Sequence, residues 1–284
     1  MKENIYVSTV AFYRSSIEQI LEVAEKENLN IEFSSGLAYN ERMGEVFLNS
    51  NLRRLPHNYF PSPKEPFVLN LASKNENIRR KSIEMCKNGL HFAAEGNCTF
   101  YSAHAGYCID PEPGQLGGKL NVGSNINKKE HWEIFIASIN EILLIARKVK
   151  VPFLIENNVI ITANLIDNEN PLFCCDSYEI KKLEKEINDP LFGILLDTAH
   201  LKVSSNSLGL NKIAEVENCV SIIKALHHSD NDGLTDSNLR LTNSYWFAEF
   251  LPFFKNNINV IEVKNIDVNE IHEQEKLLLN YFEK

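Results

Sequence analysis

Acidic and imidazole side chains repeatedly follow short apolar runs in this sequence of 284 residues. The clearest example is the run Phe192 to Leu196, which is typical of a strand buried on both faces and precedes Asp197. A charge at the end of a buried strand is destabilising unless it is paired or binds a metal. The same order recurs at His57, His104, Glu156, His227 and Glu262. These residue types could bind a divalent cation or transfer protons.

Strand-like and helix-like patterns alternate about eight times, which is typical of βα units around a parallel sheet. Polar residues at the strand ends predict a (β/α)₈ TIM barrel of the α/β class, because this fold carries its active site at the C-terminal rim of the strands. We expect residues 1–284 to form one such domain, since about 250 residues are typical for it. The predicted strands are 5–11, 30–34, 53–57, 98–104, 151–156, 192–196, 222–227 and 258–262.

Helical periodicity and end signals predict the intervening helices. Ser16 and Gln19 form a capping box at the start of the first helix, and Gly96 ends the third. The other predicted helices are 40–51, 76–95, 130–148, 176–187, 212–219, 245–254 and 268–282. The segment 111–124 contains four glycines and two prolines, so we expect a loop that covers the rim.

The composition restricts the partners of this chain. Its formal net charge of -9 argues against a large nucleic-acid interface, which usually needs a basic surface. No apolar run approaches the roughly 18 residues of a membrane span, and the N-terminal residues do not form a signal-peptide pattern. The six cysteines form no C-x-x-C pair, so we expect reduced thiols in a cytoplasmic protein. The oligomeric state has no signature in the sequence.

The polar residues at the predicted rim are individually ambiguous but informative as a group. They are His57, His104, Glu156, Asp197, His200, His227, Asp230, Asp236 and Glu262. Each alone could cap a helix or make a structural hydrogen bond. Glu32 could be an exposed strand residue or a carboxylate that points into the barrel mouth. Because parallel-barrel strand ends converge, several carboxylates there would repel one another unless cations intervened, and carboxylate with imidazole suits zinc, manganese or cobalt.

Seven short motifs occur along almost the whole chain. They are Ile31-Glu32-Phe33-Ser34, Pro56-His57-Asn58, His104-Ala105-Gly106, Ile155-Glu156-Asn157, Leu196-Asp197-Thr198-Ala199-His200, His227-His228-Ser229-Asp230 and Ile261-Glu262. In this order they resemble the xylose isomerase-like TIM barrel superfamily. That superfamily includes sugar and sugar-phosphate isomerases and epimerases, and also the endonuclease IV family.

Resemblance to the epimerase branch implies a divalent-metal-dependent isomerase or epimerase of a small sugar or sugar phosphate. The implied metal ligands are Glu156, Asp197, His227 and Glu262. His227 is favoured over His228 because the family spacing places an aspartate three positions later, at Asp230. Glu156 and Glu262 would be the catalytic acid and base on opposite faces of the sugar, working through an enediolate. The implied substrate-binding residues are Glu32, His57, His104, His200 and Asp230.

Resemblance to the nuclease branch implies instead a zinc-dependent phosphodiesterase that acts at abasic DNA sites with three metals. His57 and His104 would join Glu156 at one metal, and His200 and Asp236 would need a further histidine at another. The chain has Asn238 at that position, and an amide is a poorer transition-metal ligand than imidazole. We therefore expect one cation in an epimerase and up to three in the alternative. The roles of His57, His104 and His200 stay open between the two.

Overall fold

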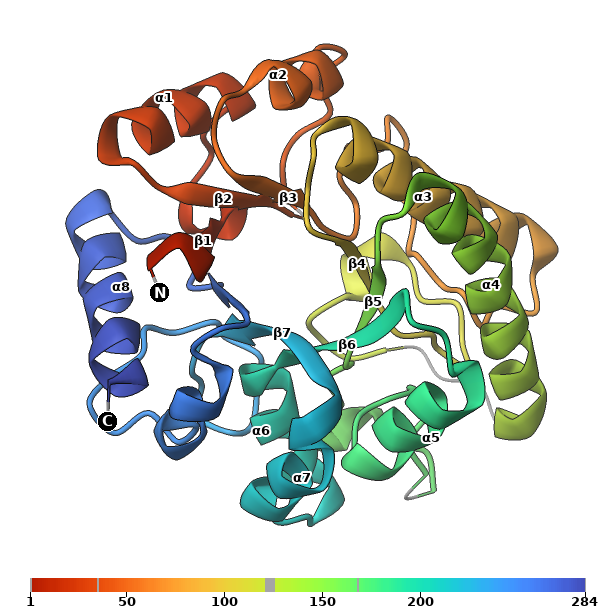
Figure 1. Ribbon diagram of the computed structural model, residues 1–284. Coiled ribbons are helices and arrows are strands. Elements are labelled where there is room, and N and C mark those ends of the chain that lie inside the picture. Colours follow the sequence, from red (N-terminus) through yellow and green to blue (C-terminus); the bar gives the residue numbers. More distant parts are fainter. Residues whose placement is uncertain (1, 35, 121–125, 168, 284) are drawn as a thin grey trace.

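A computed structural model describes residues 2–34, 36–120, 126–167 and 169–283, and its eight parallel strands curve into a nearly closed barrel (Figure 1). The strands are β1 (Ile5–Ser8), β2 (Asn30–Phe33), β3 (Arg54–Pro56), β4 (Tyr101–His104), β5 (Phe153–Glu156), β6 (Phe192–Asp197), β7 (Ile223–His228) and β8 (Ile258–Ile261). Their order in the sheet is β3-β2-β1-β8-β7-β6-β5-β4. The predicted (β/α)₈ TIM barrel is confirmed.

Helices surround the strands on the outside of the barrel (Figure 1). The α-helices are α1 (Ile17–Glu27), α2 (Met43–Asn49), α3 (Glu76–Glu95), α4 (Lys128–Val149), α5 (Ser177–Ile187), α6 (Thr198–Leu208), α7 (Lys212–Cys219) and α8 (Val268–Phe282). The 3₁₀ helices are η1 (Lys2–Asn4), η2 (Thr9–Ala11), η3 (Pro113–Gln115), η4 (Thr162–Asn164), η5 (Val220–Ile222) and η6 (Ala248–Phe254). No helix among the described residues is long and apolar enough to cross a membrane.

Local end signals in the sequence are confirmed. The Ser16 side chain accepts a hydrogen bond from the Gln19 amide in a complete capping box, and Gly96 is the C-cap of α3. All six cysteines are free thiols, as predicted. The predicted loop at 111–124 contains η3, and its residues 121–124 lie outside the part of the chain that the structure describes.

Two predicted elements differ from the structure, and one helix of the structure has no predicted counterpart. The first strand ends at Ser8, and the next three residues form η2 instead of extending the strand. The helix predicted over 245–254 is the 3₁₀ helix η6, which contains Pro252 and therefore lacks one amide donor. Helix α6 was not predicted because it begins directly after β6, with Asp197 ending the strand and capping the helix.

The barrel closes between β3 and β4 through a single bridge. His57 pairs with Ser102 in parallel, and the Asn58 amide donates to the Ser102 carbonyl at 2.7 Å. The Tyr101 hydroxyl donates to the Asn58 carbonyl at 2.6 Å, which adds a side-chain contact to this seam. The closure of the barrel therefore involves His57, one of the predicted site residues.

Gly89 of α3 packs directly against this seam. A Cβ at this position would lie 2.2 Å from the Tyr101 ring, whose side chain is fully buried. We predict that Gly89→Ala lowers the free energy of unfolding by about 1–2 kcal/mol, because overpacking outweighs the gain of up to ~1 kcal/mol in helix propensity. Gly114→Ala, where a Cβ meets nothing within 4 Å, is the matched control. Urea denaturation measures both variants, and a stabilised Gly89→Ala protein would contradict this packing.

Candidate metal centre

The two-residue period of the strands positions the polar site above an apolar layer. Leu154, Leu195, Ala225 and Val260 belong to one buried apolar cluster contributed by β5, β6, β7 and β8. Side chains two positions further along a strand point to the same face. The residues at those positions are Glu156, Asp197, His227 and Glu262. The apolar layer keeps these polar groups out of contact with bulk water from below, so their charges are poorly screened.

These four side chains converge on one point. Each offers one ligand atom, and the four atoms lie within 4.8 Å of one another. His227 Nδ1 is 3.0 Å from Glu262 Oε2 and 3.3 Å from Glu156 Oε1. Asp197 Oδ2 lies 4.0 Å from the same nitrogen. Glu156, Asp197 and His227 are buried, whereas the Glu262 side chain is 13% exposed. The sequence-predicted ligand set is therefore assembled in space.

Several atoms of this cluster lie within ion-pair distance of one another or of a neighbouring imidazole, yet make no well-aligned hydrogen bond to any described residue. They are Glu156 Oε2, Asp197 Oδ2 and His227 Nδ1, all buried. Buried polar atoms normally have a partner, so these groups fit a site for a cation. Three carboxylates and one imidazole, with no thiolate, suit zinc, manganese or cobalt.

The charges in the cluster shift pKa values in opposite directions. Burial opposes ionisation of Glu156, but the nearby imidazoles of His104, His227 and His57 outweigh it and hold the pKa of Glu156 well below its usual value. Burial likewise opposes ionisation of Glu262, yet His227 lowers the pKa of Glu262 to about 2. Burial, together with Glu262 and Glu156, raises the pKa of Asp197 well above its usual value. The ionised form of Asp197 is therefore disfavoured by the neighbouring carboxylates, and a bound cation would stabilise it.

A second group of ligand atoms shares Glu156. Atoms of His57, His104 and Glu156 also lie within 4.8 Å of one another. Glu156 Oε2 is 3.2 Å from His57 Nε2 and 3.5 Å from His104 Nδ1. Burial lowers the pKa of His104 to about 4, which keeps its imidazole neutral and able to act as a ligand or an acceptor.

The third group implied by the nuclease branch is incomplete. His200 Nε2 lies 3.4 Å from Asp236 Oδ2, and His200 Nδ1 lies 2.9 Å from the Asn157 carbonyl. Asn238 is buried, and its side-chain amide contacts the Ser229 hydroxyl at 3.4 Å. Asn238 lines the same cavity as His200 and Asp236, and it offers an amide instead of an imidazole.

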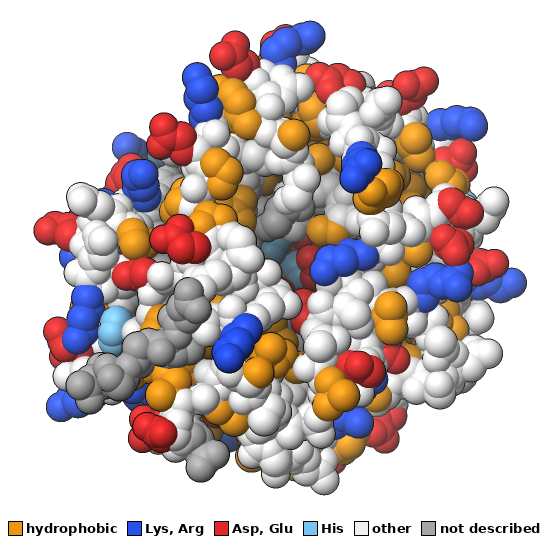
Figure 2. Space-filling model, turned by 180° about the vertical axis from the view of Figure 1, so that it is seen from behind, with side chains coloured by type: hydrophobic (Ala, Val, Ile, Leu, Met, Phe, Trp, Pro, Cys, Tyr) orange, Lys and Arg blue, Asp and Glu red, His pale blue; other side chains and the backbone are white. Residues whose placement is uncertain are grey.

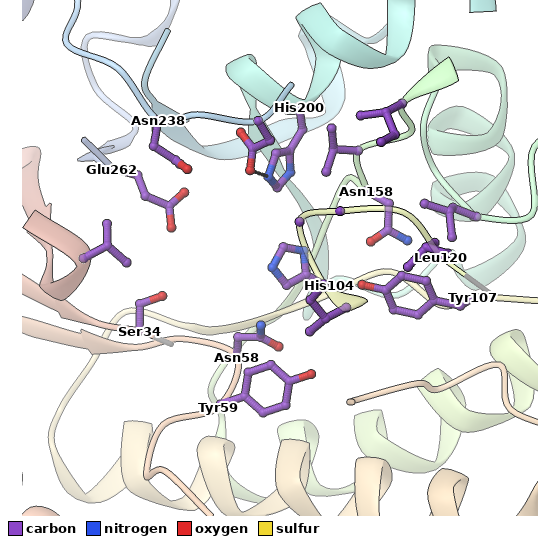
Figure 3. Close-up of a pocket in the computed structure, with 18 of the residues that line it drawn as sticks. Ser34, Asn58, Tyr59, His104, Tyr107, Leu120, Asn158, His200, Asn238 and Glu262 are labelled. Atoms are coloured by element: carbon purple, nitrogen blue, oxygen red, sulfur yellow. Dashed lines mark ion pairs between the residues drawn. The ribbon is translucent and has the colours of Figure 1, made fainter. Parts of the chain in front are cut away.

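A cavity of about 320 Å³ opens above the cluster. Figure 2 shows the molecule from the side opposite to Figure 1, with a hollow near the centre of that face and with histidine and acidic side chains visible inside it. In Figure 3, His104 lies in the middle, with Glu262 and Asn238 to one side and Tyr107 and Leu120 to the other. The polar lining includes His57, His104, His200, Asp236 and Glu262, and the apolar lining includes Leu116, Leu120, Ile161 and Leu172. The size and mixed lining suit a small, partly polar molecule.

Two predicted substrate-binding residues lie elsewhere. Glu32 is fully buried, with Oε2 3.0 Å from His227 Nε2, and it is absent from the described residues that line the cavity. Asp230 Oδ1 accepts from the Lys202 ammonium at 2.6 Å, and Asp230 is also absent from that lining. Glu32 therefore contacts a predicted ligand, Asp230 forms an ion pair with Lys202, and their binding of substrate stays a prediction.

The structure also gives contacts to two residues of the sequence motifs that had no predicted role. The Asn157 side chain accepts from the Asp197 amide at 2.7 Å and donates to the Asp197 carbonyl at 3.1 Å, which fixes the backbone of that residue. Its only sequence signal is that it follows Glu156. His228 points away from the cluster and contacts the Tyr245 hydroxyl at 3.0 Å and Asn259 Oδ1 at 2.8 Å. Adjacent strand residues face opposite sides, which gives a physical reason to favour His227 as the ligand.

The fold and the cluster of acids and imidazoles define a TIM barrel with a candidate metal site at one end of its strands. Comparison with known families identifies the family. The family model described as "Xylose isomerase-like TIM barrel" matches residues 8–266. The chain belongs to this family. A comparison with curated protein sequences gives no match.

Solved structures include two epimerase-type neighbours and one nuclease. A D-tagatose 3-epimerase-like protein is 21% identical with a TM-score of 0.75, covering 99% of this chain and 97% of that one. D-psicose 3-epimerase from Clostridium cellulolyticum is 12% identical with a TM-score of 0.66, covering 99% and 98%. Endonuclease IV from Thermus thermophilus is 14% identical with a TM-score of 0.62, covering 99% of each chain. At these identities the likeness demonstrates the fold.

Metal binding by the four residues can be tested with a substitution at Asp197 that keeps its role as the N-cap of α6. Asp197 Oδ1 accepts from the His200 amide at 2.7 Å, and asparagine retains that oxygen. We predict that Zn²⁺ or Mn²⁺ at about 100 times its dissociation constant raises the melting temperature of the wild type by about 5 °C. Asp197→Asn should lose this increase, because it removes a charged ligand.

Asp176→Asn is the matched control, because Asp176 Oδ1 caps α5 by accepting from the Glu179 amide at 2.8 Å, away from the centre. Thermal unfolding with and without metal measures all three proteins. An unchanged metal response in Asp197→Asn would exclude Asp197 as a ligand.

Proposed function

We propose that this protein is a divalent-metal-dependent isomerase or epimerase of a small sugar or sugar phosphate. The observation that carries the proposal is the convergence of Glu156, Asp197, His227 and Glu262 within 4.8 Å of one another beside a cavity of about 320 Å³. Two of these ligands are glutamates, which can also transfer protons. The family and its epimerase-type neighbours in structure support this assignment.

The proposed chemistry is proton transfer at the carbon beside a carbonyl. A divalent cation held by the four residues would stabilise the negative charge of the enediolate. Glu262 lines the cavity and can approach the substrate directly, whereas Glu156 is buried against His57 and His104. One glutamate removes the proton and the other returns it. His57, His104 and His200 line the cavity, which supports the proposal that they contact the substrate.

Proton transfer makes the reaction visible through solvent exchange. In D₂O, the metal-loaded wild type should incorporate deuterium at the carbon beside the carbonyl of at least one ketose or sugar phosphate in a panel. Glu262→Gln and Glu156→Gln should each lower the rate by about 10²- to 10⁴-fold, because each removes a proton-transfer group.

Glu133→Gln is the control, since Glu133 lies on the surface of α4 with its side chain 67% exposed. Metal content is measured in every variant, which separates loss of the proton-transfer group from loss of the cation. Absence of exchange with every sugar by the metal-loaded wild type would refute the proposal.

A second candidate is an endonuclease IV-like zinc phosphodiesterase. It is favoured by the His57, His104 and Glu156 group and by the contact of His200 with Asp236. Asn238 weighs against it, because the third ligand group then lacks an imidazole. The comparisons leave nucleic acid open as a partner, since endonuclease IV is among the structural neighbours.

An abasic DNA duplex distinguishes the two candidates. We predict that the zinc-loaded wild type leaves the duplex intact, because its third ligand group ends in an amide. Asn238→His adds the absent imidazole and serves as the comparison. Gel analysis measures strand nicking, and efficient nicking by the wild type would favour the nuclease over the epimerase.

A further inference from the structure

Glu32 is a buried carboxylate with one ionic neighbour. It lies on β2 in register with Ser8 of β1 and Leu55 of β3, and its exposed fraction is 0%. Its Oε2 is 3.0 Å from His227 Nε2, and no other described residue lies within ion-pair distance. Its Oε1 makes no hydrogen bond to any described residue. Because burying a carboxylate is unfavourable, the contact with His227 needs an explanation.

The two nitrogens of His227 face different groups. Nε2 points to Glu32, and Nδ1 lies 3.0 Å from Glu262 and 3.3 Å from Glu156. A neutral imidazole carries one N–H, so one nitrogen donates and the other keeps a lone pair. If Nε2 carries the hydrogen, it donates to Glu32 and the Nδ1 lone pair faces the cluster. In the other tautomer, the Nε2 lone pair would face the Glu32 carboxylate, which is repulsive.

The orientation of the ring is also restricted. The His57 ring packs edge-on against His227 with 5.0 Å between centroids. His57 is itself held by Ser102 Oγ, 2.8 Å from its Nδ1, and by Glu156, 3.2 Å from its Nε2. The ring of His57 therefore packs against the ring of His227, whereas Glu32 supplies the acceptor at Nε2.

We propose that Glu32 is a positioning residue that holds His227 in its Nε2–H tautomer and so makes Nδ1 the metal ligand. This inference rests on the metal centre of the proposed function and extends it to a residue outside the four ligands. Carboxylates that accept the second N–H of a metal-ligating histidine typically contribute 10- to 100-fold to metal affinity. Glu32 thus acts through His227 and does not contact substrate.

Glu32→Gln tests the proposal with almost no change in side-chain shape. Its amide is uncharged and can rotate to donate to Nε2, which favours the wrong tautomer. We expect Zn²⁺ affinity, measured by competition with a chelator, to fall about 10- to 100-fold. Glu275→Gln is the matched control, because Glu275 accepts from His272 Nδ1 at 2.8 Å on α8 and is buried to a similar extent. That variant should keep wild-type affinity.

A second measurement needs no variant of Glu32. Long-range ¹H–¹⁵N NMR of the Zn²⁺-loaded wild type reports which nitrogen of His227 carries the hydrogen, with the resonance assigned by its loss in His227→Asn. The proposal predicts a protonated Nε2 and a metal-bound Nδ1. Ligand atoms of Glu32, His57 and His227 also lie within 4.8 Å of one another. A metal-bound Nε2, including a cation held by these three residues, would overturn the proposal, as would unchanged Zn²⁺ affinity in folded Glu32→Gln.

These results separate the inference from the proposed function. Zinc bound through Nδ1 of His227 without any deuterium exchange would leave the role of Glu32 standing and refute the epimerase. Exchange activity with zinc bound through Nε2 would support the epimerase and refute the proposed role of Glu32. Neither measurement depends on knowing the substrate.

Discussion

The repulsion between carboxylates buried in the barrel interior is the constraint on which the site depends. Glu156 and Asp197 are almost inaccessible to solvent, and Glu262 lies beside them. The layer beneath them is apolar, so no water from that side can screen their charges. Removing a charge from water costs several kcal/mol unless an opposite charge compensates. A single divalent cation between them would supply that opposite charge.

The scaffold meets this requirement through strand geometry and a second layer of hydrogen bonds. The period of two along each strand sets the polar residues above the apolar layer, and the parallel arrangement brings them to one end. Asn157 fixes the backbone of Asp197. On the outer side, the Thr198 hydroxyl lies 2.6 Å from the Tyr245 hydroxyl, which contacts His228. Burial lowers the pKa of His228 to about 4, so this chain of hydrogen bonds contains a neutral imidazole.

Sequence patterns were sufficient for the architecture and for the convergence of the main site residues. Alternating periodicity located the strands, and the barrel rule placed their ends together, which is how Glu156, Asp197 and Glu262 could be grouped. The direction of Glu32 could not be predicted, because it depends on the register of β2 against β1 and β3. The pairing of Asp230 with Lys202 depends on a flexible side chain from a helix that the pattern did not reveal. Side-chain partners of this kind require coordinates.

We propose that one cation is shared by residues from four strands or strand ends. Anomalous diffraction from crystals grown with Mn²⁺ tests it most directly, because the scattering locates the ion independently of any activity. We predict one strong peak at roughly 2.0–2.3 Å from an oxygen of Glu156, Asp197 and Glu262 and from His227 Nδ1. Ordered side chains in the arrangement described above with no peak between them, at saturating Mn²⁺, would contradict it.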